Sequence, residues 1–476
     1  MLFHTPTFLA FFLVFLAFYL PVRRTEAGVW VILAFSNVFY GWWNWKFLGL
    51  LWATIIVDYS LGRLLARTGD RTARRLLLGA SLATNLGILG FFKYYNFFVS
   101  GLVVAGLDAS RGWRIRDLAL PVGISFYVFQ SMSYTLDVYR REQEPVRSLA
   151  RFAAFVCYFP QLVAGPIERL KHLLPQILSP APITVERVIH GIFLFSLGFF
   201  RKAMADTLAA FVDPVFGHLQ AAAPADVVLA IFTFGLQIYL DFTGYVDMAR
   251  GVSRVIGIDL VMNFDAPYLS TSPREFWRRW HISLSRWLRD YLYISLGGNR
   301  RGLPRHLANL MVTMLLGGLW HGAGLNFVAW GGLHGIYLVL NTLWDRYAPP
   351  PARGRAPASI PRALLGWLLT FVAVNYAWLY FRSPTIADAM IANRKLAQWI
   401  LHPSLPGATV GYAILVGIAA LMELLIRFRA GPGWGEGLPP RPAAALARGA
   451  FAGLFVVTGL VLLAGIPTQQ FIYFQF

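Results

Sequence analysis

Apolar stretches recur along the whole chain, and most approach the length of about 20 residues that a helix needs to cross a bilayer. Short polar stretches separate them, and no segment between them is long enough to be a soluble domain. The pattern predicts an all-α polytopic membrane protein with one integral-membrane domain over residues 1–476. The expected spans are residues 8–20, 27–45, 47–61, 76–107, 118–139, 185–200, 227–247, 327–343, 363–381, 411–426 and 450–465.

One segment breaks this pattern. Residues 155–176 are short and carry Pro160, Pro166 and Pro175, each of which lacks the N–H that a continuous helix requires. Irregular backbone at membrane depth persists only when it is buried in protein or lines a cavity. We therefore expect a re-entrant or broken element here, and residues 203–216 are a second candidate for an element that lies in the membrane plane.

The composition supports a membrane protein. Hydrophobic residues make up 57% of the chain and charged residues 14%, against about 25% charged in soluble domains. The net charge of +19 gathers between apolar runs, which favours cytoplasmic loops facing anionic lipid over nucleic-acid binding. Basic loops at 270–305, 346–362 and 427–448 are predicted to be cytoplasmic, which places the tail at 466–476 outside. Residues 382–408 are read as a loop.

The stretch 272–326 carries the residues best suited to chemistry. His321 lies in GGLWHGAG, where glycines allow backbone or a slender ligand to approach closely. An ionisable group within a membrane segment is a functional candidate, and desolvation keeps an imidazole neutral, as a general base must be. The alternative is a histidine that makes one hydrogen bond between helices.

His281 follows a basic, tryptophan-rich sequence. Apolar residues here recur at three- and four-residue spacing, which predicts one amphipathic helix at the cytoplasmic interface: Trp277, Trp280, Leu284, Trp287 and Leu288. The alternative is an anchoring helix with an incidental histidine. Arginines on this stretch are suited to the phosphates of a donor, and the candidate donor-binding residues are Arg274, Arg278, Arg279, Arg286 and Trp320.

Other polar residues are read as structural. His190 and His334 are expected to be packing residues, and Asp241 and Asp247 to be partners of arginine or backbone. No metal site is expected, because HExxH is absent and neither His281 nor His321 has acidic or cysteine companions at ligand spacing. The single cysteine excludes a disulfide within the chain.

Several motifs together resemble the membrane-bound O-acyltransferases, in particular the bacterial alginate O-acetyltransferase branch. They are LPVGISFYVFQSMSY, FPQLVAGPIER, LDFTGYVDMARG, FWRRWHISLSRWLRDYLYISLGGNR and GGLWHGAG. The resemblance implies a ring of about eleven membrane spans with re-entrant and in-plane helices around a central tunnel. It also implies that His321 is the invariant catalytic histidine and His281 the second histidine of that family.

The resemblance further implies the substrates and partners. The donor would be a cytoplasmic acyl thioester, with acetyl-CoA the first candidate and no bound cofactor. The acceptor would be an extracytoplasmic polysaccharide such as alginate, reached through a periplasmic SGNH-like acetyltransferase partner. The location would be the bacterial inner membrane.

The C-terminal sequence FIYFQF is similar to an aromatic motif in which a tyrosine is thought to carry the acyl group, here Tyr473. A phenol with a pKa near 10 is a better leaving group than an alcohol, so an aryl ester keeps much of the transfer potential of a thioester. The alternative is an aromatic belt that ends the last span.

Two further interpretations stay open. A transporter or flippase also has broken spans and a basic inner face, although we find no paired half-sequence symmetry. Within the family, a D-alanyl or longer-chain acyltransferase is the other reading, because neither the acyl group nor the polymer can be read from the sequence.

Overall fold

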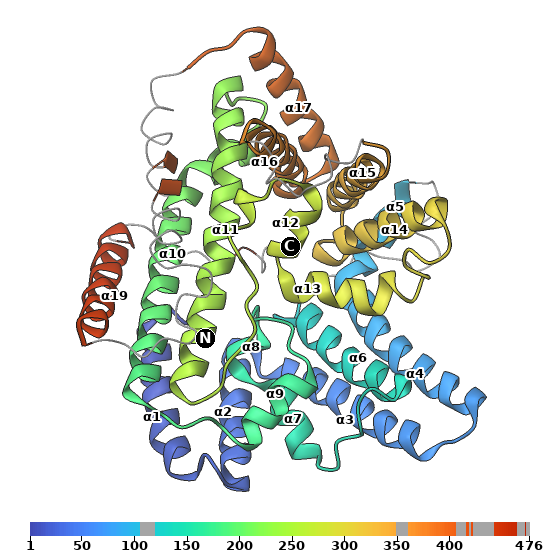
Figure 1. Cartoon of the computed structure of the whole chain (residues 1–476), viewed down its shortest axis with the longest axis vertical. Helices are drawn as coiled ribbons and strands as arrows, with labels where there is room; N and C mark the ends of the chain where they lie inside the picture. Colours follow the sequence, from blue (N-terminus) through green and yellow to red (C-terminus); the bar gives the residue numbers. More distant parts are fainter. Residues whose placement is uncertain are drawn as a thin grey trace. The chain divides into compact units, whose positions relative to one another are not determined.

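The computed structural model describes residues 1–104, 120–348, 360–405, 416–417, 420–421, 442–463 and 472 (Figure 1). The described residues are mostly helical and contain no strand, which confirms the all-α prediction. Two compact units are present. The first comprises Met1–Phe199, Tyr245–Val261 and Pro439–Val456, and the second comprises Phe200–Gly244, Met262–Leu438 and Val457–Phe476.

The first unit begins with the N-terminal helices. Its elements are α1 (Pro6–Val22), α2 (Glu26–Asn44), α3 (Lys46–Arg67), α4 (Arg71–Leu89), the π-helix η1 (Gly90–Tyr94), α5 (Tyr95–Val104), α6 (Ile124–Arg140), α7 (Leu149–Cys157), α8 (Phe159–Leu162) and α9 (Leu170–Leu178). Parts of α10 (Val185–Gly217), α11 (Pro224–Val255) and α19 (Pro442–Leu463) also belong to it. Phenylalanines of α1, α2 and α8 form one packed cluster, in which the Phe15 and Phe159 ring centroids lie 5.2 Å apart. α6 packs against both α3 and α4.

The proline-rich segment is broken, as its sequence predicts. α7 ends at Cys157, the four-residue α8 contains Pro160, and Pro166 lies between α8 and α9. Pro175 is different, because it lies inside α9 and does not end the helix. Burial of the apolar face of α9, which consists of Leu170, Leu173, Leu174 and Ile177, offsets the hydrogen bond that this proline cannot make.

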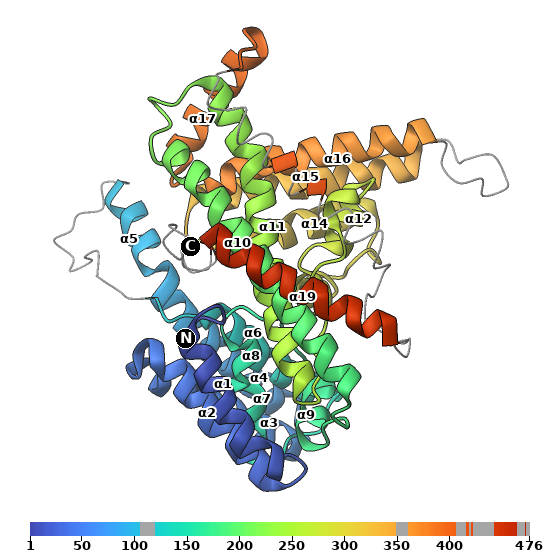
Figure 2. The same cartoon turned by 90° about the vertical axis from the view of Figure 1, so that its left-hand side faces the viewer.

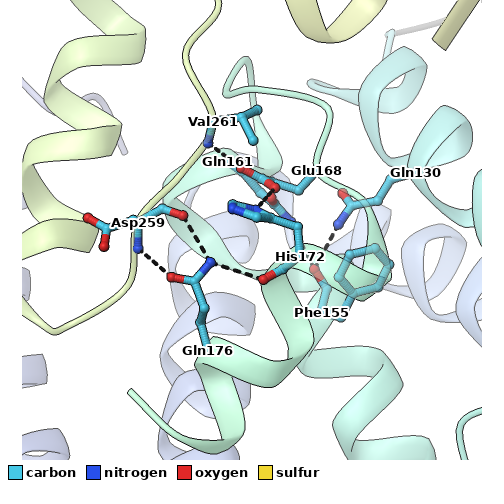
Figure 3. A network of polar contacts seen from close by, with 8 residues as sticks. All are labelled: Gln130, Phe155, Gln161, Glu168, His172, Gln176, Asp259 and Val261. Atoms are coloured by element: carbon cyan, nitrogen blue, oxygen red, sulfur yellow. Dashed lines mark hydrogen bonds and ion pairs between the residues drawn. The ribbon is translucent and has the colours of Figure 1, made fainter. Parts of the chain in front are cut away.

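A buried carboxylate ties α9 to the chain that follows α11 (Pro224–Val255), as Figure 3 shows. Glu168 accepts a hydrogen bond from the Val261 N–H at 2.6 Å, and its other oxygen lies 2.7 Å from His172 Nδ1. Gln176 donates to the Asp259 carbonyl at 3.1 Å and accepts from the Asp259 N–H at 2.8 Å. Residues 259–261 are therefore held in place within the first unit.

The second unit carries the candidate histidines. Its elements are the ends of α10 (Val185–Gly217) and α11, η3 (Pro267–Leu269), α12 (Pro273–Arg279), α13 (Ile282–Trp287), the π-helix η4 (Leu288–Tyr293), α14 (Leu303–His321), α15 (Leu325–Tyr347), α16 (Ile360–Arg382), α17 (Ile386–Leu401) and the end of α19 (Pro442–Leu463). α15 packs against both α14 and α16 (Figure 2).

Five helical segments among the described residues are long and apolar enough to cross a membrane. They are Lys46–Arg67, Arg71–Gly101, Val185–Gly217, Pro224–Val255 and Ile360–Arg382. The chain is a polytopic membrane protein on this basis, and the tunnel and the count of about eleven spans stay predictions.

Two sequence expectations in this part of the chain are wrong. α10 is one helix of 33 residues that includes residues 203–216, which therefore form no separate in-plane element. The segment read as a loop at 382–408 contains α17, whose polar residues include Arg394 and Lys395. Lys395 donates to the Ala222 carbonyl at 2.8 Å, so a charge that indicated a loop instead serves a tertiary contact. The expected span at 411–426 and Tyr473 in the tail lie outside the described residues, apart from four positions of the span.

Candidate functional site

The crossing of α14 and α15 sets the position of His321. A Cβ atom on Gly318 would lie 2.3 Å from the Phe327 carbonyl oxygen, and one on Gly331 would lie 2.3 Å from the Met314 carbonyl oxygen. Each glycine therefore leaves room for the backbone of the facing helix. Small residues commonly allow such close approach between helices in membrane proteins. The sequence suggested that the glycines of GGLWHGAG admit backbone or a ligand, and at Gly318 the backbone of the facing helix takes the space.

His321 is the last residue of α14 and lies in an aromatic cage. Its ring centroid is 4.9 Å from that of Trp320, 5.0 Å from that of Trp330 and 5.3 Å from that of Phe381. The side chain of Trp330 comes from α15 and that of Phe381 from α16, so three helices contribute to the cage. His321 is 4% exposed. Its imidazole thus lies in a largely apolar environment of the kind that favours the neutral ring.

His281 lies at a break between two short helices, where the sequence predicted one continuous amphipathic helix. α12 ends at Arg279, and His281 takes the left-handed backbone conformation with φ 41° and ψ 56° before α13 begins. This conformation is uncommon for a residue other than glycine, and such residues cluster at functional sites. The break turns the side chain inward, so His281 is completely buried and does not lie on an exposed interfacial face.

Asn263 holds the start of α13 in place. Its backbone carbonyl accepts from the Ile282 N–H at 2.9 Å, and its side-chain Oδ1 accepts from the Ser283 N–H at 3.2 Å. The first N–H groups of a helix have no acceptor within that helix, so Asn263 acts as an N-cap supplied from a distant part of the chain. No local pattern in the sequence could identify this residue, because it lies 18 positions before His281.

The two histidines lie side by side although they are 40 positions apart in the sequence. Their ring centroids are 6.4 Å apart, and Trp320 borders both rings. The edge of Phe242 on α11 packs against His281 with centroids 4.7 Å apart. Burial lowers the pKa of His281 to about 3, so this imidazole is neutral at physiological pH. Two neighbouring imidazoles are suited to share the movement of one proton.

The predicted donor-binding arginines fall into two groups. Arg274 pairs with Asp345 at 2.6 Å, and Arg279 pairs with Glu275 at 2.7 Å, so both arginines already have a carboxylate partner. Arg278 and Arg286 are exposed. Trp320, the fifth predicted donor-binding residue, is 5% exposed and lies with the histidines.

His334, one of the residues read as structural, makes packing contacts. His334 accepts a hydrogen bond from Trp277 Nε1–H at 3.2 Å, and its ring centroid lies 4.8 Å from that of Trp330. Trp330 therefore packs between His334 and His321. The functional candidates that sequence reasoning missed are Phe242, Asn263, Trp330 and Phe381, and all four are defined by long-range contacts.

The chain matches the sequence of a known protein family. The sequence model of the MBOAT family, described as membrane-bound O-acyltransferase, matches residues 39–382. That range includes both histidines and every described residue of the aromatic cage.

Individual relatives cover most of the chain. It is similar to "Probable alginate O-acetylase AlgI" of Pseudomonas aeruginosa, with 41% identity over 430 residues, which is 87% of this chain and 80% of that protein. It is 34% identical to "Peptidoglycan O-acetyltransferase" of Helicobacter pylori over 82% of this chain and 78% of that protein. A more distant relative, "Teichoic acid D-alanyltransferase" of Streptococcus thermophilus, is 28% identical over 55% of this chain and 68% of that protein.

Proposed function

The chain belongs to the membrane-bound O-acyltransferase family, and we propose that it transfers acetyl groups from a cytoplasmic thioester toward an extracytoplasmic polysaccharide. The proposed donor is acetyl-CoA, and the proposed location is the bacterial inner membrane. Alginate or another cell-envelope glycan is the proposed acceptor, since similar proteins are named for alginate and for peptidoglycan. Acetyl is favoured over D-alanyl because the D-alanyltransferase is the more distant relative.

The observation that carries this proposal is the buried pair of His281 and His321. Their ring centroids are 6.4 Å apart within aromatic walls. One hydroxyl oxygen held by a normal hydrogen bond of about 2.6–3.2 Å to either ring would stay within reach of the other. Acyl transfer requires a group that accepts a proton and then returns it, and two adjacent imidazoles are suited to that task, whereas transport does not require it.

In the proposed first step, His321 accepts the proton of the Tyr473 hydroxyl while the phenol oxygen attacks the thioester carbonyl carbon. The new C–O bond forms as the C–S bond breaks, and the departing thiolate takes the proton from the His321 imidazolium. His281 assists by forming a hydrogen bond that involves the same proton. No net proton or electron is consumed, and the products are an acyl-tyrosine and free coenzyme A.

In the proposed second step, the acyl-tyrosine gives its acetyl group to a periplasmic SGNH-like partner that acetylates the polysaccharide. The aryl ester can do so because the phenol, with a pKa near 10, leaves readily. The partner hydroxyl supplies the proton that restores the Tyr473 phenol. Tyr473 thereby returns to its starting state in each cycle.

The proposed donor site uses the basic residues of α12 and α13. Arg278 and Arg286 are exposed and suited to the phosphates of coenzyme A. Arg274 and Arg279 would contribute charge while they retain their ion pairs with Asp345 and Glu275. Trp320, which packs on His321, is suited to contact the thioester end of the donor.

The test is to incubate membranes containing the protein with radiolabelled acetyl-CoA and to analyse the C-terminal peptide by mass spectrometry. We expect acetyl label on Tyr473, none in Tyr473→Phe, and a loss on the order of a hundredfold to ten-thousandfold in His321→Ala. The matched control is His190→Gln, which replaces another buried histidine, on α10, and should retain labelling.

Three results would contradict the proposal. Normal polymer acetylation by Tyr473→Phe would exclude the tyrosine relay. Unchanged turnover in His321→Ala would exclude this histidine as the base. Passage of a labelled sugar across vesicles without any acetyl label on the wild-type protein would favour a transporter.

A further inference from the structure

The second unit contains a buried ion cluster that includes neither histidine. Lys202 Nζ on α10 lies 2.6 Å from Asp206 Oδ1 and 2.8 Å from Asp241 Oδ1 on α11. All three residues are at most 3% exposed. Buried ion pairs add little stability over apolar residues of similar size, and charged groups inside membrane helices commonly serve function. The cluster therefore calls for a role beyond packing.

The two carboxylates of this cluster differ in one respect. Asp241 Oδ2 accepts a hydrogen bond from the backbone N–H of Ile472 at 2.8 Å, across a sequence separation of 231 residues. Ile472 is 4% exposed. The same carboxylate accepts a hydrogen bond from Lys202 Nζ through its other oxygen, Oδ1, and hydrogen bonds that involve a charged group are about twice as strong as neutral ones. Asp241 thus fixes the backbone of the C-terminal tail at one point.

The anchored point also lies next to the site on α11. Asp241 is followed directly by Phe242, whose ring packs edge-on against His281 with centroids 4.7 Å apart. Consecutive Cα atoms are only about 3.8 Å apart, so two adjacent residues of α11 contact Ile472 of the tail and His281 of the histidine pair. Ile472 in turn is covalently bonded to Tyr473.

We infer that Asp241 is a positioning residue that, supported by Lys202, anchors Ile472 and so delivers the tail to the histidine pair. The inference rests on the proposed function, because it assigns the anchor to the tyrosine relay. It predicts that Asp241 acts through the tail and not through the donor. Loss of the anchor should therefore lower the rate of Tyr473 acetylation without changing the KM for acetyl-CoA.

The chain offers a matched pair of variants for the test. Asp241→Ala and Asp206→Ala each remove one of the two carboxylates that contact Lys202, but only Asp241 accepts from Ile472. Each change is combined with Ile472→Cys, and the rate of maleimide labelling is measured in membranes. The lone native cysteine, Cys157, is completely buried, and its background is measured without the introduced cysteine.

We expect Asp241→Ala to raise the labelling rate at position 472 on the order of tenfold to a hundredfold, and Asp206→Ala to change it less than about threefold. If Asp241→Ala lowers protein abundance, Asp241→Asn replaces it, since the amide keeps the shape and removes the charge; a smaller increase in the same direction is then expected. Equal labelling rates in Asp241→Ala and Asp206→Ala would overturn the proposed anchor. An unchanged labelling rate in both Asp241→Ala and Asp241→Asn would also overturn it.

The acetylation assay separates this inference from the proposed function. Slower acetylation of Tyr473 in Asp241→Ala at an unchanged KM for acetyl-CoA supports the anchor. An altered KM at an unchanged rate overturns it. If Tyr473 is never acetylated in the wild type, the relay fails, while the labelling rates still report on whether Asp241 holds the tail.

Discussion

Replacing Asn263 with alanine tests how His281 is held at the site. The side chain of Asn263 is completely buried, and its Oδ1 accepts from the Ser283 N–H at the start of α13. The substitution removes this acceptor but keeps the backbone carbonyl that binds Ile282. His281, which directly precedes α13 in a left-handed conformation, would lose one of the contacts that fix its backbone.

The size of the effect follows from the capping contact. Removal of a helix N-cap costs about 0.5–2 kcal/mol, and a buried donor that loses its acceptor costs about 1–3 kcal/mol. If about 2 kcal/mol of this loss falls on the geometry of the histidine pair, the rate falls roughly 30-fold. α13 has only six residues, so little else in the helix can compensate.

The assay is acetylation of the C-terminal peptide in membranes, with the protein amount matched by immunoblot. Asn263→Asp is the matched control, because a carboxylate keeps the acceptor and its charge suits a helix N-terminus. We expect the alanine variant to lose rate while its KM for acetyl-CoA stays unchanged, and the aspartate variant to keep a rate closer to that of the wild type.

Two outcomes would refute this reasoning. A full rate in Asn263→Ala would mean that the cap does not determine the position of His281. Equal loss in the alanine and aspartate variants would mean that the amide is required for a reason other than its acceptor oxygen.

Three further predictions concern packing, the donor and pH. Gly318→Ala should lower the apparent melting temperature in detergent, because its Cβ would lie 2.3 Å from a backbone oxygen of α15, whereas Gly332→Ala, whose Cβ would approach no atom more closely than 3.6 Å, should be neutral. Arg278→Gln should raise the KM for acetyl-CoA several-fold with little change in kcat, and an unchanged KM would remove this arginine from the donor site. The hydrogen bond that His172 Nδ1–H donates to Glu168 raises the pKa of His172, so the stability that this pair contributes is complete below about pH 6.5 and is lost as the pH rises through the raised pKa. His172→Ala should therefore lower the melting temperature more at pH 6 than at pH 9, and an equal loss at both would contradict the ion pair.

Much of the fold follows from local patterns in the sequence. Apolar length predicts α16 within three residues and the starts of α3 and α11 equally well, although these two helices continue six and eight residues beyond the predicted ends. The prolines at 160 and 166 predict the break between α7 and α9. Helix propensity gives the wrong prediction at Pro175, which lies inside α9. Burial of the apolar face of this helix outweighs the one hydrogen bond that the proline cannot make. Propensity also fails at 382–408, where the charges that suggested a loop lie on α17.

The candidate site is predicted in part. The sequence identifies His281 and His321, and the structure brings them together. The sequence does not reveal the break at His281, because the helical spacing of tryptophans and leucines continues through that position although the helix ends there. The walls of the site are also hidden, because Phe242 and Asn263 come from other parts of the chain and carry no signal of their own.

The left-handed backbone at His281 also determines how its imidazole can be removed most cleanly. Glycine adopts this conformation without steric cost, whereas alanine keeps a Cβ that opposes it by about 1–2 kcal/mol. His281→Gly would therefore remove the ring and relieve the backbone strain at this position. The cavity left behind would have the shape of an imidazole molecule. If added imidazole restores turnover, the ring of His281 takes part in the chemistry. If it does not, the ring serves only to support the structure.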